Sequence, residues 1–354
     1  MVTVMKIIVT MGTPAQFYFF KYAIGELVER GHNILIASRE TEAVVQLLNN
    51  SGFNYKSLGK RRNSNYLGIM LLQLEEEFRL LKLARRFKPD YLIAFTGIGA
   101  SHIGRLIGKP SIVFTDSEGS TISNILSFPF ASVIITPSSF RKKIGRKHVR
   151  FNGFKELAYL HPNYFKPDIS IYDELGLAKD DKFIVVRFNA FKAFHDIGKR
   201  GFTFNKKIEL INQLSDYARV FVSAERGLPP ELHSYILPTS PHRIHQVLYY
   251  AQLLVSDSAT MNTESAVLGT PSITCLSNAD QFGNFIELEY KYDLLYAISE
   301  PERAITKAIE LIKQPDLKKK WAKKRLALLE DKIDVTRFMV DFIENYPESY
   351  KNYR

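Results

Sequence analysis

The chain has 354 residues, enough for two domains of about 150–200 residues each. Hydrophobic residues make up 45% of it and charged residues 24%, and no run approaches the roughly 18 apolar residues of a membrane span. This composition excludes disordered, fibrous and membrane-spanning proteins. Its single cysteine, Cys275, excludes an internal disulfide, and residues 1–10 lack the features of a signal peptide. A cytoplasmic protein is therefore expected.

The chain is basic. Lys and Arg outnumber Asp and Glu by 48 to 37, a net charge of +11, which favours anionic partners. Basic segments at residues 80–87 and 318–329 mix Lys and Arg with Leu, and they suit peripheral contact with an anionic membrane surface. The alternative is that each is an ordinary solvated helix face. No nucleic-acid partner is expected, because no helix-turn-helix, zinc-finger or aromatic RNA-binding signature is present. No oligomeric state is predicted.

The first half of the chain alternates short apolar runs with amphipathic stretches, as βαβ units of a parallel sheet do. Residues 16–30 carry apolar positions at helical spacing, and Gly31 ends that helix. Strands are predicted at residues 6–10, 33–37, 91–95, 111–115 and 132–135.

A second series of such elements follows the proline-bearing residues 161–167. Helices are predicted at residues 206–217, 242–251 and 262–268, and strands at residues 183–187, 219–223, 253–256 and 272–276. We therefore expect an α/β fold of two Rossmann-like domains with doubly wound parallel sheets, residues 1–163 and 164–354. The last helix is a candidate to pack back on the first domain. A ligand is expected in a cleft at the carboxyl ends of both sheets.

The most informative segment is residues 253–271, LLVSDSATMNTESAVLGTP. It predicts a buried strand, a polar turn and a helix, and a helix amino terminus offers unpaired N–H groups to phosphate oxygens. A carboxylate one turn into that helix is suited to a ribose diol, or else it complements the helix dipole. The nucleotide-sugar-binding candidates here are Ser258, Thr260, Met261, Asn262 and Glu264.

The same segment resembles the nucleotide-binding motif of GT-B glycosyltransferases and UDP-N-acetylglucosamine 2-epimerases, which ends in a glutamate followed by Leu-Gly-x-Pro. Residues 187–198, 241–251 and 257–271, with 153–160 and 284–289, are similar to an uncharacterised, mainly archaeal family of GT-B type. The resemblance implies a GT-B-like fold and a nucleotide-sugar substrate, a UDP-sugar, with no bound cofactor or metal. One departure is Ser258-Ala259 in place of paired glycines. Because a Cβ restricts the backbone, side chains and helix amides are expected to hold the phosphate.

Further candidates follow other strands. Arg187 ends a strand and could clamp a diphosphate or form an inter-domain ion pair. His195 and Asp196, in the next loop, are candidate catalytic groups, with a loop-stabilising hydrogen bond as the alternative for His195. Asp116 and Glu118 are the best carboxylates to deprotonate an acceptor hydroxyl, unless they cap a helix or form a turn. No metal-ligand spacing is evident.

Three functions fit these features. The leading one is a metal-independent sugar transferase with a nucleotide-sugar donor and a glycan or lipid-linked acceptor. A 2-epimerase fits less well, because its family uses an aspartate where this chain has Thr96-Gly97 and a histidine near Arg187 that is absent here. The third is a non-catalytic nucleotide-sugar-binding protein.

Overall fold

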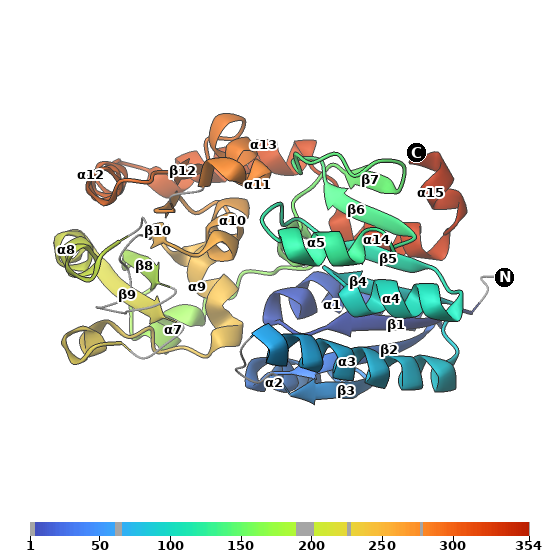
Figure 1. Cartoon of the computed structure of the whole chain (residues 1–354). Helices are drawn as coiled ribbons and strands as arrows, with labels where there is room; N and C mark the ends of the chain where they lie inside the picture. The colour runs from blue at the N-terminus through green and yellow to red at the C-terminus, as the bar shows by residue number, and fades with distance from the viewer. Residues whose placement is uncertain (1–3, 61–65, 189–201, 225–227, 277–278, 354) are drawn as a thin grey trace. The chain divides into compact units, whose positions relative to one another are not determined.

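The computed structural model describes residues 4–60, 66–188, 202–224, 228–276 and 279–353. It divides into two compact units: unit 1 comprises Met1–Tyr159 and Ile333–Arg354, and unit 2 comprises Leu160–Lys332. Each unit is built on its own parallel sheet (Figure 1).

Unit 1 contains a seven-stranded parallel sheet in the order β3-β2-β1-β4-β5-β6-β7. The order reverses between β1 and β4, which is the switch point at which open α/β sheets bind ligands. The strands are β1 (Lys6–Met11), β2 (Asn33–Glu40), β3 (Tyr55–Lys60), β4 (Tyr91–Phe95), β5 (Ser111–Phe114), β6 (Val133–Pro137) and β7 (His148–Phe151).

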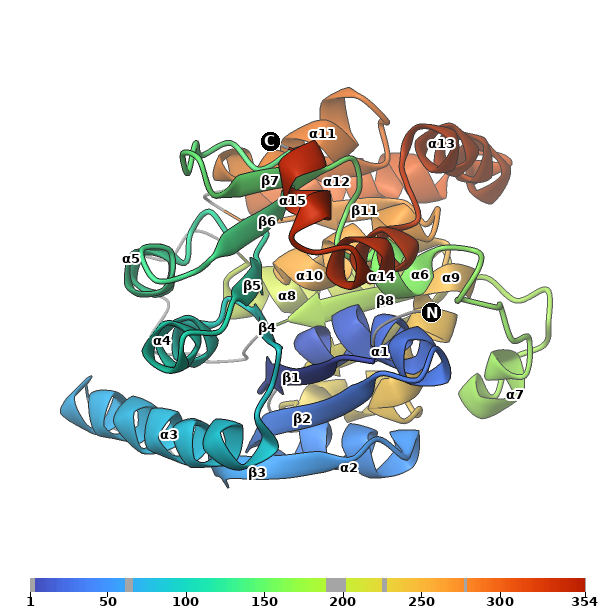
Figure 2. The ribbon, with the colours of Figure 1, turned by 90° about the vertical axis from the view of Figure 1, so that its right-hand side faces the viewer.

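Helices cover both faces of this sheet, as expected for strands that are apolar on both sides. Figure 2 shows α3, α4 and α5 on one face and α1, α2 and α14 on the other. Their bounds are α1 (Pro14–Glu29), α2 (Glu42–Ser51), α3 (Tyr66–Phe87), α4 (Ile98–Ile107), α5 (Thr121–Ser127), α6 (Leu157–Leu160), α14 (Val335–Glu344) and α15 (Glu348–Asn352). Thr13 caps α1, with Pro14 in its first turn, and this fixes the turn that follows β1.

Hydrogen bonds tie the C-terminal segment to the first part of unit 1, two of them close to the point where the chain returns. Ile333 N donates to Asn152 O at 2.9 Å, and Thr336 Oγ1 donates to Ala158 O at 2.7 Å. The chain thus leaves unit 1 after Tyr159 and returns to it at Ile333.

Unit 2 contains a five-stranded parallel sheet in the order β12-β11-β10-β8-β9. Its strands are β8 (Phe183–Phe188), β9 (Arg219–Ala224), β10 (Leu253–Ser256), β11 (Ser272–Thr274) and β12 (Leu295–Ala297). Its helices are α7 (Ile171–Leu175), α8 (Phe204–Ser215), α9 (Ile244–Tyr250), α10 (Ala259–Val267), α11 (Gly283–Tyr290), α12 (Pro301–Ile312) and α13 (Leu317–Asp331), with short 3₁₀ turns at Pro230–Tyr235, Pro241–Arg243 and Ala279–Gln281.

The two parallel sheets confirm the predicted fold class. Every predicted strand is present within a residue or two, except that β2 is longer than predicted and β11 is shorter. Two of the differences bear on function. The helix after β10 begins at Ala259 rather than at Asn262. The basic segment at residues 80–87 is only the second half of a longer helix, α3.

Candidate functional site

The turn between β10 and α10 is built by side chains of its own residues. Ser258 N donates to Ser256 Oγ at 2.8 Å. The Asn262 amide donates to Ser256 O at 3.2 Å and to Ser258 O at 3.0 Å, and it accepts from Ser272 Oγ at 2.6 Å. Asn262 is 0% exposed. The Asn262 amide therefore fixes the path of the turn. It acts on a ligand only by positioning the other residues of the turn.

The turn presents the amino terminus of α10. Ser258 precedes the helix, and its hydroxyl makes no capping bond to the described backbone. The first-turn N–H groups are consequently not used by a side-chain cap, and N–H groups at this position bind anions well. Ser258 and Thr260 are half-buried beside them, whereas Met261 is buried.

Glu264 lies further along the same helix and is 5% exposed. Its Oε1 lies 3.1 Å from Nε2 of His245, on the preceding helix α9. Both side chains are almost fully enclosed, so His245 fixes the position of the carboxylate. The sequence separated these two residues, and the structure brings them together.

Arg187 lies beside this turn. It is paired in the sheet with Ser256 on β10 and with Ser223 on β9. Its Nη1 donates to Ser223 Oγ at 2.8 Å, and its carbonyl accepts from Asp257 N at 3.3 Å. The guanidinium is thus at the carboxyl edge of the sheet, on the strand next to the α10 turn. His195 and Asp196 lie outside the described residues.

Asn284 is a member of this group that the residue-by-residue sequence reasoning missed. It lies at the start of α11, and its Nδ2 donates to Thr263 Oγ1 at 2.9 Å. The only signal for it in the sequence was its place in the segment 284–289, which resembles the archaeal family.

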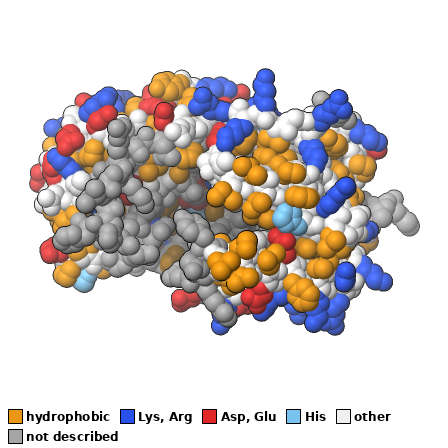
Figure 3. Space-filling view, in the orientation of Figure 1, with side chains coloured by type: hydrophobic (Ala, Val, Ile, Leu, Met, Phe, Trp, Pro, Cys, Tyr) orange, Lys and Arg blue, Asp and Glu red, His pale blue; other side chains and the backbone are white. Residues whose placement is uncertain are grey.

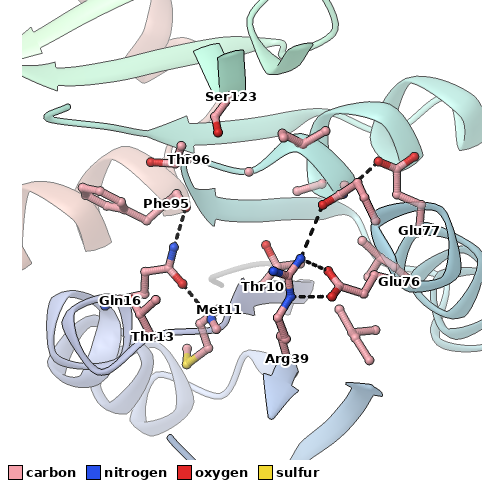
Figure 4. Close-up of a pocket in the computed structure, with 18 residues that line it drawn as sticks. Thr10, Met11, Thr13, Gln16, Arg39, Glu76, Glu77, Phe95, Thr96 and Ser123 are labelled. Carbon is pink, nitrogen blue, oxygen red and sulfur yellow. Dashed lines mark hydrogen bonds and ion pairs between the residues drawn. The ribbon is translucent and has the colours of Figure 1, made fainter. Parts of the chain in front are cut away.

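Unit 1 has a pocket of about 350 Å³ at the carboxyl edge of its sheet. Figure 4 shows the Gln16 side chain hydrogen-bonded on two sides: it accepts from Gly12 N at 2.6 Å and donates to Phe95 O at 2.9 Å. Those two bonds join the turn after β1 to the end of β4. Thr96, which also lines the pocket, has φ of 55°, a costly conformation for a β-branched residue.

The pocket is charged on its α3 side. Arg39, at the end of β2, forms an ion pair with Glu76 of α3 (Figure 4). Burial raises the pKa of the Glu76 carboxyl, and the adjacent Arg39 offsets part of that rise. Glu77 lines the same wall and lies 3.1 Å from Nδ1 of His102. Arg39, Glu76 and Glu77 were not identified from the sequence, since residues about 37 apart meet only in the folded sheet.

A smaller, adjoining pocket contains one of the predicted bases. It shares Thr13, Gln16 and Thr96 with the first pocket. Asp116 lines it, and its carboxylate lies 2.6 Å from Nζ of Lys155. Lys155 belongs to the segment 153–160 that resembles the archaeal family.

Glu118 is placed differently. It is buried, and its carboxylate accepts from Arg141 N at 3.0 Å while its carbonyl accepts from Lys142. The side chain therefore stabilises the loop before α5, which agrees with the turn-forming alternative. Of the two carboxylates after β5, only Asp116 lines a described pocket.

Cys275 follows β11 and is buried. Burial raises the pKa of its thiol to about 12, so almost none of it is thiolate at neutral pH. In the part of the chain that the structure describes, no cluster of three or more His, Cys, Asp or Glu side chains is arranged to hold a metal ion.

Two doubly wound parallel sheets, each with its polar groups at the carboxyl edge, define a two-domain α/β protein of GT-B type. The chain belongs to the family described as "Protein of unknown function (DUF354)", which matches residues 5–348. An uncharacterised protein of Methanocaldococcus jannaschii, MJ0665, is 24% identical over 269 residues, which are 73% of this chain and 78% of that protein.

Solved structures of low sequence identity share the fold. The UDP co-structure of MnaA from S. aureus aligns over 98% of both chains with 12% identity and a TM-score of 0.71. UDP-GlcNAc 2-epimerase from Neisseria meningitidis, bound to UDP-GlcNAc, aligns over 96% of this chain and 99% of its own with 13% identity and a TM-score of 0.66. The spinosyn forosaminyltransferase SpnP aligns over 99% and 100% with 12% identity and a TM-score of 0.66.

Proposed function

We propose that the chain binds a nucleotide-sugar on unit 2 and transfers the sugar to an acceptor held by unit 1. The observation that carries the proposal is the α10 turn, in which Asn262 and Ser256 hold a helix amino terminus at the carboxyl edge of a parallel sheet, with no capping bond from Ser258 to the described backbone. Such a terminus favours a phosphate group by its N–H donors and its partial positive charge. The proteins of similar fold that are described as bound to UDP and UDP-GlcNAc support a nucleotide-sugar as the ligand.

Three groups of unit 2 are assigned to parts of that ligand. Backbone N–H groups of α10, with the Ser258 and Thr260 hydroxyls, take the diphosphate. Arg187, one strand away, neutralises the charge that develops on it as the sugar leaves. Glu264, held by His245, accepts from the ribose hydroxyls.

Unit 1 supplies the acceptor side of the reaction. Its two adjoining pockets share Gln16 and Thr96, and Asp116 lines the smaller one. Asp116 is the base that removes the acceptor hydroxyl proton as the new glycosidic bond forms, and Lys155 lies beside it and orients it. The larger pocket is wide enough for a sugar-sized acceptor.

Titration calorimetry with UDP tests the donor site. A hydrogen bond to a charged group contributes about 1.5–3 kcal/mol, so Glu264→Gln should weaken UDP binding roughly tenfold or more while keeping the size of the side chain. Glu310→Gln is the matched control, because Glu310 is exposed on α12 of the same unit. Wild-type protein that binds none of UDP, ADP, GDP and TDP contradicts the proposal.

Epimerisation of a UDP-sugar is a second candidate, favoured by the likeness to two 2-epimerases. The two reactions differ in what happens to the substrate. An epimerase exchanges the proton at the sugar C2, and a transferase releases the nucleotide diphosphate. Incubation with UDP-sugars in heavy water separates them: deuterium at C2 with no transfer of the sugar to any acceptor would replace the transferase proposal.

A further inference from the structure

Helix α3 carries apolar side chains on its exposed face. Leu67 is 62% exposed and Phe78 is 70% exposed, and Met70, Leu71 and Leu74 between them are similarly open. Their spacing of three and four residues places all five on one side of the helix. The side of an amphipathic helix that faces water is normally polar, so this stripe needs a partner.

The stripe belongs to a larger surface of unit 1. Among the described residues, 11 of the 19 large hydrophobic side chains that are exposed lie on α3, α4, α5 or the turn after α5, so they are clustered rather than scattered. On α5, Ile122 is 76% exposed and Ile125 is 65% exposed. We call ten of these eleven residues, all except Ile69, the apolar face: Leu67, Met70, Leu71, Leu74, Phe78, Leu106, Ile122, Ile125, Leu126 and Phe130. Figure 3 shows hydrophobic side chains gathered in two groups over the α5 and α3 side of the unit. A patch of this kind marks an interaction site.

Basic residues border the apolar face. Lys82 and Arg85 continue the exposed side of α3 beyond Phe78, at the same helical spacing. Glu75, which lies near the stripe, is paired with Arg79 at 2.5 Å. The exposed α3 surface is therefore apolar over its first half and cationic over its second.

A second cationic point lies at the other end of the face. Lys147 donates to Pro129 O at 2.8 Å, next to Phe130. Burial lowers the pKa of Lys147, and the positive charge of Arg105 nearby lowers it further. Two cations held close together are stabilised by an anion, which a phospholipid headgroup provides.

The acceptor pocket opens among these helices. Gln73, Glu76 and Glu77 of α3 and Ser123 of α5 line it. Leu74, which follows Gln73, and Ile122, which precedes Ser123, belong to the apolar face. The same two helices thus offer polar groups to the pocket and apolar groups to the surface around it.

We propose that the apolar face and its basic border dock unit 1 on an anionic phospholipid bilayer, where the pocket meets acceptors carried on a lipid. The docking stands without the transferase activity, and only the lipid-borne acceptor rests on the function proposed above. A second copy of the chain is the other possible occupant of an apolar surface. Anionic headgroups favour the bilayer over a second copy, because they complement the Lys82 and Arg85 side chains of the basic border. Among the described residues, no helix has both the length and the hydropathy of a membrane span.

Vesicle pelleting with the full chain tests this docking. Vesicles are made of phosphatidylcholine alone or with added phosphatidylglycerol. One variant carries Leu71→Ser and Phe78→Ser, and a second carries Lys82→Glu and Arg85→Glu. The control carries Lys323→Glu and Leu326→Ser, which make the same kinds of change at exposed positions of α13, the other basic helix.

Wild-type and control proteins should pellet with the anionic vesicles and not with the neutral ones. Both α3 variants should lose about tenfold or more of that binding, and they should still bind UDP as the wild type does. No wild-type pelleting, equal loss in the control, or unchanged binding of the α3 variants would overturn the docking. A dimer seen by sedimentation without vesicles would also overturn the docking if the variant with Leu71→Ser and Phe78→Ser is monomeric. That result would assign the face to a second copy. If the protein binds vesicles but does not bind UDP, the transferase function is ruled out and the docking stands.

Discussion

Asn262 shows how a side chain that is good at binding ligands can be used for structure instead. The sequence marks it as a ligand residue because it lies in the first turn of α10. In the structure its amide makes three hydrogen bonds within unit 2, to Ser256 O, Ser258 O and Ser272 Oγ. A polar group that is fully buried must be satisfied internally, and satisfying it here fixes the path of the turn.

Replacing Asn262 by Ala should therefore destabilise unit 2. The substitution removes the amide from Ser256 O and Ser258 O, which keep backbone partners, and it leaves the buried Ser272 hydroxyl without its acceptor. An unsatisfied buried group costs about 1–3 kcal/mol. We expect the free energy of unfolding in urea to fall by about 2 kcal/mol or more. A comparable Asn→Ala change at Asn345, whose amide makes an exposed bond at the end of α14, should cost less. Equal losses would contradict the role given to Asn262.

Residue-level prediction from the sequence locates a side chain where its place depends on position along the chain. Ser258, Thr260 and Arg187 lie at the edge where a strand followed by a helix predicts them. It failed where partners come from distant segments. Nothing in the sequence pairs Glu264 with His245 or Asp116 with Lys155, because the members of each pair are too far apart in the chain for their spacing to predict a contact.

At the scale of elements, α13 shows the same difference between pattern and packing. Its residues 318–329 suggested a basic helix for a membrane surface. In the structure Trp321 donates to Leu294 O at 3.1 Å, and Arg325 donates to Val267 O at 3.0 Å. Lys318 donates to Tyr249 O at 2.7 Å and to Thr270 Oγ1 at 2.6 Å. Three of its cationic or aromatic side chains therefore tie the helix to unit 2, which is why we assign the membrane contact to α3.

The environment of Lys318 makes the stability of unit 2 depend on pH. Burial lowers the pKa of Lys318 to about 7, and the positive charge of Arg325 contributes. Above this pH the folded protein has lost the proton that the unfolded chain keeps up to its ordinary pKa of about 10.4. Because the unfolded state then binds more protons, the free energy of unfolding rises with pH across that window, by about 1 kcal/mol per pH unit. Below about pH 7 both states keep this proton, so the contribution of Lys318 to the free energy of unfolding no longer changes with pH.

Denaturant unfolding at several pH values measures this effect. The difference in free energy of unfolding between wild type and Lys318→Met should increase from neutral to mildly alkaline pH. Lys320→Met, on the exposed side of the same helix, should leave a difference that is flat in pH. A flat difference for Lys318→Met as well would mean that the ammonium is not desolvated in the folded protein.

The sequence predicts the inner strands of both sheets, but it misses the edge strands β3, β7 and β12 and the first half of helix α3. Buried parallel strands are continuous apolar runs, and such runs are recognisable without knowing their partners. Helix α3 is apolar on its exposed side, so residues 66–79 lack the alternation of faces that indicates a helix. Its second half, residues 80–87, regains Lys and Arg and was recognised.

At the scale of the whole molecule, the two units have similar architecture and different surfaces. Each sheet brings polar groups to its carboxyl edge: the α10 turn and Arg187 in unit 2, and the Gln16 pocket in unit 1. Among the residues that the structure describes, unit 1 alone adds an apolar face with a basic border. This division fits a protein in which one unit holds a soluble donor and the other meets an acceptor at a membrane.

A crystal structure of the protein soaked with UDP tests the central claim most directly. We predict density for the diphosphate within hydrogen-bond distance of the α10 amino terminus at Ser258–Thr260, with the ribose beside Glu264. Density for UDP in the Gln16 pocket of unit 1, or an α10 turn left empty at saturating UDP, would contradict it.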